Sequence, residues 1–188
     1  MKNSILLWIL ILLSGCDLFE LRKHEEPSSF RSSFVQPVVP ENVPENLRLS
    51  FSEANKENFR KCLGDPDDPD SYLFIPSPEL QSQIPFLDQQ QEVSSFSNLV
   101  LDLLPEEKKI TLQFIEPKLV NQIDSAEWQA GYSLFISRSS TDYPSFIDGK
   151  MVLNLRKDKQ GFWYIYRWRD YSLSDTYCWS KLKWRFVR

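Results

Sequence analysis

The sequence predicts an α+β domain in which helices from the first half of the chain pack on a curved antiparallel β-sheet from the second half. Apolar residues recur at helical spacing between residues 50 and 104, whereas from residue 110 onward they alternate with polar residues, as in half-buried strands. Residues 161–171 carry bulky side chains at both alternating sets of positions, so we expect a central strand that is covered on both faces. Together these patterns predict a sheet that lies over the apolar stripes of helices.

Length and composition fit one domain with additional segments. A chain of 188 residues is in the range of a single core, and the aromatic content of 14% predicts a core built with Phe, Tyr and Trp. The net charge of -4 gives no long-range attraction to nucleic acid or to anionic lipid. We therefore expect no nucleic-acid partner.

The N-terminus reads as a secretion signal. One lysine precedes a short apolar run, residues 5–13, and small residues follow before Cys16. The ending Leu13-Ser14-Gly15-Cys16 resembles the lipobox of bacterial lipoproteins, in which the signal is removed before a cysteine that is then lipidated. The resemblance implies a signal peptide at residues 1–15, lipidation of Cys16, and a membrane-anchored protein of the bacterial cell envelope. The alternative is an ordinary signal peptide with an incidental cysteine.

The sequence does not decide between the inner and the outer membrane for the expected anchor. Asp17 resembles the inner-membrane retention signal of enterobacterial lipoproteins, but this rule differs between bacterial groups. After Cys16 the chain is rich in proline and polar residues, so we interpret residues 16–47 as a tether and residues 48–188 as the folded domain. The tether has five apolar exceptions, which either dock on the domain as an added strand or are tolerated in the tether: Phe30, Phe34, Val35, Val38 and Val39.

The helical part of the domain has clear start and stop signals. Ser50 and Glu53 have the spacing of a capping box for a first helix that extends to residue 63. A short buried strand is predicted at residues 72–76, followed by a brief helix with Pro78 at its first position. Asp88 and Gln91 then cap a longer helix, which we expect to run to residue 104.

The second half of the chain predicts four long strands and a less regular end. Alternation marks strands at residues 110–114, 126–136, 147–155 and 161–171, with turn-like connections between them. The last segment, residues 176–187, is predicted to be one more strand or an irregular sheet edge. We interpret the basic residues near this end as charges that guard the sheet edge against aggregation.

This order of elements resembles the nuclear-transport-factor-2-like (NTF2-like) superfamily, often called SnoaL-like, over about residues 48–188. The resemblance implies a cone of curved sheet around helices. That scaffold hosts enzymes, binding modules and dimerisation domains, so it does not select a function. The residues that carry the resemblance are Asn58, Phe59, Cys62, Phe74, Trp128, Ala130, Tyr132, Trp163, Ile165, Arg167, Trp168 and Asp170.

Candidate catalytic groups are carboxylic and phenolic. The single histidine, His24, lies in the tether, which leaves no histidine base or His-ligated metal for the domain. Enzymes on this scaffold use a cavity Asp or His with Tyr donors, and the resemblance therefore implies Asp170 as base with Tyr132 or Tyr166 as donor. The reading that we favour is structural: Asp170 ends a strand and pairs with an arginine or a backbone amide.

Aromatic residues and cysteines each allow two readings. Several aromatic side chains either line a ligand cavity or simply fill the core. Cys62 and Cys178 either form a disulfide in an oxidising envelope or are two separate buried thiols. We expect no metal and no cofactor. The candidate ligand-binding residues are Trp128, Tyr132, Tyr164 and Trp168.

These patterns favour a lipid-anchored envelope protein with a non-catalytic domain that binds a small apolar ligand or a protein partner through the cone. The alternative is an isomerase, cyclase or hydrolase that uses a cavity Asp and Tyr. A third reading is a homodimer formed through the open face of the sheet.

Overall fold

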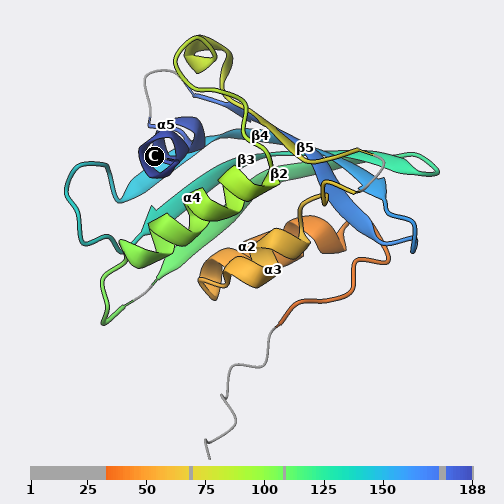
Figure 1. The fold of residues 1–188 in the computed structure, drawn as a ribbon, viewed down its shortest axis with the longest axis horizontal. Helices are drawn as coiled ribbons and strands as arrows, with labels where there is room; N and C mark the ends of the chain where they lie inside the picture. The colour runs from red at the N-terminus through yellow and green to blue at the C-terminus, as the bar shows by residue number, and fades with distance from the viewer. Residues whose placement is uncertain (1–32, 68–69, 108, 174–176, 188) are drawn as a thin grey trace, which may run out of the picture. The chain divides into compact units, whose positions relative to one another are not determined.

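The computed structural model of the protein describes residues 33–67, 70–107, 109–173 and 177–187, which form an α+β fold (Figure 1). The expected signal peptide at residues 1–15, the lipidation site Cys16 and the tether up to residue 32 lie outside the described residues. The strands are β1 (Leu73–Ile75), β2 (Ile110–Asn121), β3 (Ser125–Ile136), β4 (Phe146–Lys157) and β5 (Trp163–Tyr171). The helices are α2 (Asn42–Ser52), α3 (Lys56–Lys61), the 3₁₀-helix η2 (Pro78–Leu80), α4 (Gln89–Leu101) and α5 (Trp179–Phe186).

The sheet confirms the predicted meander. Strands β2 to β5 pair antiparallel in sequence order, and β1 adds parallel to β5, which gives the order β1-β5-β4-β3-β2. The register shifts between Ile115 and Lys118 and again between Asn154 and Leu155, and such bulges bend and twist a sheet. The inward-facing residues of β3 are buried at every second position, as the alternation predicts: Ala126, Trp128, Ala130, Tyr132, Leu134 and Ile136.

The first helix was predicted wrongly. Residues 50–63 form the end of α2, a break at residues 53–55, and α3, and Ser50 is buried inside α2, where its hydroxyl donates to Leu47 O at 2.6 Å. The apolar stripe of α2 begins at Val43 and recurs every fourth residue, so the helix starts before the apparent capping box. Residues 42–47, expected in the tether, therefore belong to the folded domain.

Residues 33–41 lie against the domain without forming a strand. Asn46 holds this segment from α2, because its side chain accepts from Val35 N at 2.9 Å and donates to Val35 O at 2.6 Å. Pro37 O accepts a hydrogen bond from Trp163 N at the start of β5. The proline-rich composition predicted a tether separate from the domain. In the structure, this segment is instead held to the domain at Val35 and Pro37.

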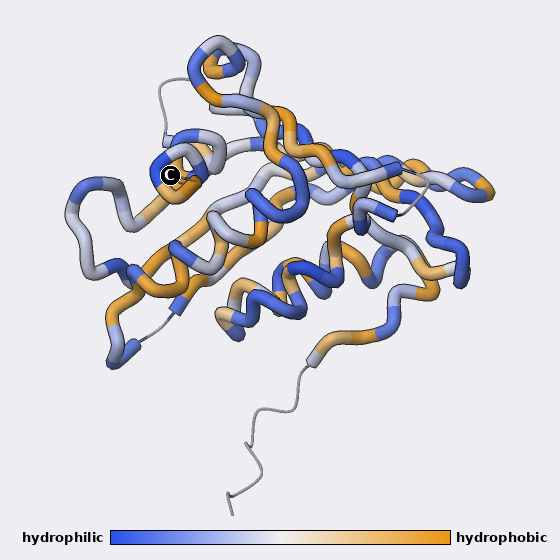
Figure 2. Tube along the Cα trace, viewed as in Figure 1, coloured by the Kyte–Doolittle hydropathy of each residue, from blue (hydrophilic) through white to orange (hydrophobic). Residues whose placement is uncertain are grey.

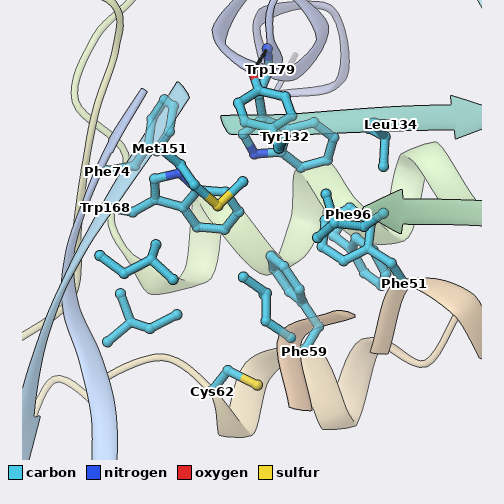
Figure 3. Close-up of a cluster of buried hydrophobic side chains, with 14 of the residues drawn as sticks. Phe51, Phe59, Cys62, Phe74, Phe96, Tyr132, Leu134, Met151, Trp168 and Trp179 are labelled. Atoms are coloured by element: carbon cyan, nitrogen blue, oxygen red, sulfur yellow. Dashed lines mark hydrogen bonds between the residues drawn. The ribbon is translucent and has the colours of Figure 1, made fainter. Parts of the chain in front are cut away.

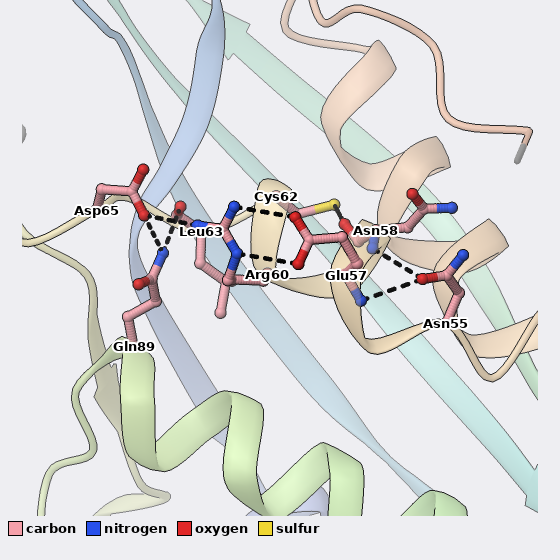
Figure 4. A network of polar contacts seen from close by, with 8 residues as sticks. All are labelled: Asn55, Glu57, Asn58, Arg60, Cys62, Leu63, Asp65 and Gln89. Carbon is pink, nitrogen blue, oxygen red and sulfur yellow. Dashed lines mark hydrogen bonds and ion pairs between the residues drawn. The ribbon is translucent and has the colours of Figure 1, made fainter.

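A polar network ties α3 to the start of α4 (Figure 4). Asn55 caps α3 by accepting from Glu57 N and Asn58 N. Arg60 pairs with Glu57 and also with Asp65, and Asp65 accepts from the side chain of Gln89 at 2.8 Å. Asp65 therefore links α3 to α4, because its carboxylate contacts Arg60 of α3 and Gln89 of α4.

Helix α4 begins as predicted. The capping box of Asp88 and Gln91 is present, and Phe96 and Leu99 are buried in the core. The helix ends at Leu101 instead of residue 104, and Leu103 instead forms a bridge with Arg138. Figure 2 shows hydrophilic and hydrophobic residues alternating along the helices, as expected for elements that bury one face.

The last segment is a helix, and the prediction of a strand or sheet edge was wrong. Leu182, Trp184 and Phe186 alternate as in a strand, but the edge of β5 is already occupied by β1. As a helix, α5 buries Trp179, Leu182 and Lys183 against the sheet and α4 instead. The arginines of β5 are consequently not edge residues.

Aromatic rings fill the space between the sheet and the helices (Figure 3). Phe59 stacks on Phe96 with ring centroids 4.3 Å apart, and Trp168 stacks on Trp179 at 6.1 Å. Phe51 contacts the rings of Phe96 and Trp179. The core thus contains many aromatic residues beside its aliphatic ones, as the composition predicts. Within the described residues, no helix is long and apolar enough to span a bilayer.

Candidate functional site

The two residues that sequence marks as a catalytic pair meet inside the cone. Tyr132 faces inward from β3 and Asp170 from β5, and the tyrosine hydroxyl donates to Asp170 Oδ1 at 2.8 Å. Both side chains are 1% exposed. The same hydroxyl accepts a hydrogen bond from Trp179 N at 2.8 Å, at the first residue of α5.

Asp170 binds the N-terminus of α5. Its Oδ2 accepts from Ser180 N at 2.7 Å and from Ser180 Oγ at 2.5 Å, so the carboxylate satisfies backbone donors of the first helical turn. This is the pairing with a backbone amide that the sequence favours, and the amide belongs to α5. Burial raises the pKa of Asp170, and the hydrogen bonds from Ser180 and Tyr132 oppose that rise.

A second buried polar pair lies nearby, and sequence reasoning missed it. Lys183 Nζ of α5 lies 2.5 Å from Glu92 Oε1 of α4, and the two side chains are 1% and 0% exposed. Burial lowers the pKa of Lys183 to about 8, although Glu92 acts in the opposite direction. Burial likewise raises the pKa of Glu92, with Lys183 opposing. The burial of Glu92 could have been predicted from helical spacing, because Glu92 lies four residues before the core residue Phe96 and therefore on the same face of α4.

Aromatic rings surround the ammonium group of Lys183. The Nζ atom is 3.4 Å from the ring centroid of Phe74, 4.1 Å from that of Trp168 and 5.0 Å from that of Trp179. These distances are in the range of strong cation–π contacts. We call Phe74, Trp168, Trp179 and Glu92 the ammonium cage.

The interior of the cone has no room for a water molecule. The narrow space there is closed by side chains of the sheet together with Phe51 of α2 and Trp179 of α5. Asp170 and Tyr132 therefore lie beneath α5 in packed surroundings. The sheet residues around this space are Leu112, Tyr132, Leu134, Met151 and Trp168.

The other predicted ligand-binding residues are dispersed. Trp128 is buried against Phe114, with ring centroids 4.6 Å apart. Tyr164 lies so close to Gly64 that a Cβ at the glycine would meet its ring at 2.7 Å. Tyr166 is half-buried and its ring lies under the guanidinium groups of Arg156 and Arg167, so it does not join Asp170. Only Tyr132 and Trp168 of the candidates adjoin the cage or Asp170.

Cys62 and Cys178 are not joined in the structure. Cys62 and Cys178 are both free and buried. Cys62 ends α3 and packs in the main core, whereas Cys178 packs with Leu80 and Ile84 in a separate cluster. Burial raises the pKa of the Cys178 thiol to about 11. This arrangement corresponds to the reading of two separate buried thiols.

Two further observations concern ligands and surfaces. In the described part of the chain, no three His, Cys, Asp or Glu side chains come close enough to hold a metal ion.

The outer face of the sheet exposes large apolar side chains. Phe135 on β3 pairs across with Phe146 on β4, and the two residues are 46% and 55% exposed. Ile115 at the bulge of β2 is 52% exposed on the same sheet.

Solved structures identify the fold. The chain is similar to the Kfla4162 protein from Kribbella flavida, with a TM-score of 0.57 and 8% identity over 78% of this chain and 94% of that one. It is similar to an NTF2-like superfamily protein from Salmonella enterica, with a TM-score of 0.53 and 14% identity over 72% and 92% of the two chains. A ketosteroid isomerase-like protein from Erwinia carotovora atroseptica gives a TM-score of 0.53 and 13% identity over 73% and 96%.

No family model matches the sequence, and no curated protein matches it. Identities this low show the fold alone. The domain has an NTF2-like α+β fold, as the sequence predicts, and the similarity assigns no activity to it.

Proposed function

We propose that the chain is a lipid-anchored protein of the bacterial cell envelope whose NTF2-like domain binds an envelope protein instead of catalysing a reaction. One observation carries the non-catalytic part. Asp170 and Tyr132 are engaged in holding α5, in an interior that does not admit water. A general base has to reach its substrate, directly or through one water, and with α5 seated this arrangement leaves no path for either.

The outer face of the sheet is the surface that we assign to the partner. Phe135, Phe146 and Ile115 are about half exposed there, and exposed apolar side chains on a sheet favour contact with another protein. A groove beside the β2 bulge adds charges of both signs, Glu116, Lys118 and Lys150. Apolar anchors next to mixed charges are typical of a protein interface.

The anchor rests on the sequence around Cys16. Several acyl chains on one residue hold a protein stably at a membrane, since each buried CH₂ contributes ~0.8 kcal/mol. Replacing Cys16 by Ser should abolish labelling of the protein with an alkyne fatty acid and move it out of the membrane fraction. Labelling that persists in Cys16→Ser would contradict the anchor.

The partner surface is tested by crosslinking the full chain in its host. The double variant Phe135→Ser/Phe146→Ser should lower recovery of the crosslinked partner by about tenfold, the effect of ~1.4 kcal/mol of binding energy. The matched control is Leu101→Ser, an equally apolar residue that is 80% exposed on α4, away from the sheet's outer face. Equal recovery of the crosslinked partner from the double variant and from the control would show that this surface does not bind the partner. A crosslink only to a second copy of the chain identifies the homodimer reading instead.

A catalytic function is the second candidate, because the Asp170 and Tyr132 pair is buried and combines an acceptor with a phenolic donor. It requires α5 to leave the mouth of the cone. Wild-type protein and Asp170→Asn should be compared on isomerase, cyclase and hydrolase substrates. Turnover by wild type that Asp170→Asn loses would favour the enzyme over the binding domain.

A further inference from the structure

The ammonium cage has the composition of a binding site for a cation. An ammonium group that contacts three aromatic rings and a carboxylate has the environment in which proteins hold organic cations. In this structure the cation is the side chain of Lys183, which belongs to the chain itself. The site is independent of the outer sheet face that we assign to a protein partner.

Receptor and occupant come from different parts of the chain. Phe74 of β1 and Trp168 of β5 are paired residues of the sheet, and Glu92 comes from α4. Lys183 and Trp179 come from α5, a helix of eight residues at the mouth of the cone. Two rings and the carboxylate therefore come from elements other than α5.

The polar groups around the cage exceed what Lys183 satisfies. Glu92 Oε2 and the Tyr72 hydroxyl are both buried. Burial raises the pKa of both groups, and the interaction between these two side chains opposes that rise for Glu92 and adds to it for Tyr72. Asp170 adds a second buried carboxylate that acts on Lys183. Two buried carboxylates thus face a single buried ammonium group in the described part of the chain, which leaves the site short of positive charge.

The lysine is a poor choice if stability alone is at stake. A buried ion pair is commonly no more stabilising than apolar side chains of similar volume, because both charges lose their hydration. An apolar residue at position 183 would fill the same space. A charge retained at this cost is better explained by a site that recognises charge.

We propose that the ammonium cage is a binding site for an organic ammonium group of a ligand, and that Lys183 occupies it as an intramolecular competitor. The ligand's ammonium replaces Lys183 Nζ between Phe74 and Trp168 and pairs with Glu92. Helix α5 is displaced when this happens, since Lys183 and Trp179 leave together.

The probe is n-propylammonium, which reproduces the lysine side chain beyond Cβ, and 1-propanol is its neutral counterpart. Each is titrated into the full chain at constant ionic strength, and the tryptophan fluorescence is recorded. Wild type should give a saturable change with n-propylammonium and none with 1-propanol, because Trp168 and Trp179 stop stacking. Proteolysis after Lys181 and Arg185 in α5 should increase in parallel.

Variants locate the effect in the cage. Lys183→Ala should bind n-propylammonium about tenfold more tightly because the competitor is removed, and Glu92→Gln should bind it about tenfold more weakly. Lys181→Ala, which removes a lysine from the same helix, is the matched control and should behave as wild type. The wild-type titration does not depend on the folding of any variant.

Two results overturn the proposal. The first is an absence of saturable change in wild type, or an equal change with 1-propanol. The second is a Lys183→Ala variant whose thermal stability n-propylammonium restores while wild type does not respond, because Lys183 is then a permanent structural ion pair.

Discussion

The hydroxyl of Tyr132 donates to Asp170 Oδ1 at 2.8 Å, while the same hydroxyl accepts from the first backbone amide of α5. One phenol thus connects strand β3, strand β5 and the C-terminal helix. The residues that sequence suggests as acid and base are, in the fold, the attachment point of a helix. Stability measurements can examine this role directly.

Replacing Asp170 by Asn should destabilise the domain by about 2 kcal/mol. Both carboxylate oxygens accept hydrogen bonds, Oδ1 from Tyr132 and Oδ2 from Ser180, but an amide offers only one acceptor. Its NH₂ group then faces a donor. The measurement is the free energy of unfolding in urea, and the control is Asp148→Asn on the outward side of β4. An Asp170→Asn variant as stable as that control would contradict the attachment role.

The pair of Glu92 and Lys183 should behave as a coupled unit. Glu92→Leu or Lys183→Met alone leaves one buried charge without a partner, and each single change should cost ~3–5 kcal/mol. The double variant places apolar side chains in the same space, so it should be more stable than either single variant. Urea unfolding of the four proteins measures this coupling. Additive effects of the two changes would show that the groups do not interact.

Lys183 should make stability depend on alkaline pH. Its pKa is lowered to about 8 in the fold, while a lysine in the unfolded chain titrates near ~10.4. Between these values the unfolded state binds more protons, so the free energy of unfolding should rise with pH from about 8 to about 10.4. Below pH 8 both states are protonated and this contribution is flat.

The groups that face Lys183 are Glu92 of α4 and Asp170 of β5, and burial raises the pKa of both. Their stabilising contributions are present below their unfolded pKa values and are lost as pH rises through the folded ones. The measurement is the difference in unfolding free energy between wild type and Lys183→Met from pH 7 to 11. A difference that does not change with pH would show that Lys183 keeps an ordinary pKa.

The elements that sequence predicted correctly are specified by local chemistry. Asp88 and Gln91 form a capping box within four residues of chain, and the alternation along β3 is a property of each strand by itself. Such signals need no knowledge of the rest of the fold. They sufficed for the meander, for α4 and for the NTF2-like arrangement.

The errors arose where a distant partner decides the outcome. Ser50 has a valid capping spacing, but Val43 and Leu47 bury a stripe that carries α2 through it. Residues 176–187 alternate like a strand, but β1 occupies the edge that such a strand needs. Lys183 is charged in sequence and buried in the fold, because the rings and the carboxylate that receive it come from three other elements.

Gly149 on β4 should be intolerant of any side chain, because it pairs across the sheet with Tyr132. A Cβ at this position would lie 2.5 Å from the tyrosine hydroxyl oxygen and 2.6 Å from the adjacent ring carbon. Tyr132 has little freedom to move aside, since Asp170 and Trp179 N hold its hydroxyl. We expect Gly149→Ala to destabilise the domain by ~1–3 kcal/mol, as overpacking of a core does. Gly131→Ala on β3 is the matched control, where the nearest atom, Ile115 Cβ, would be 3.3 Å away. Thermal unfolding of both variants measures the difference. If Gly149→Ala and Gly131→Ala have the same melting temperature, then Tyr132 can move aside freely. The Tyr132 hydroxyl would then not hold α5 firmly.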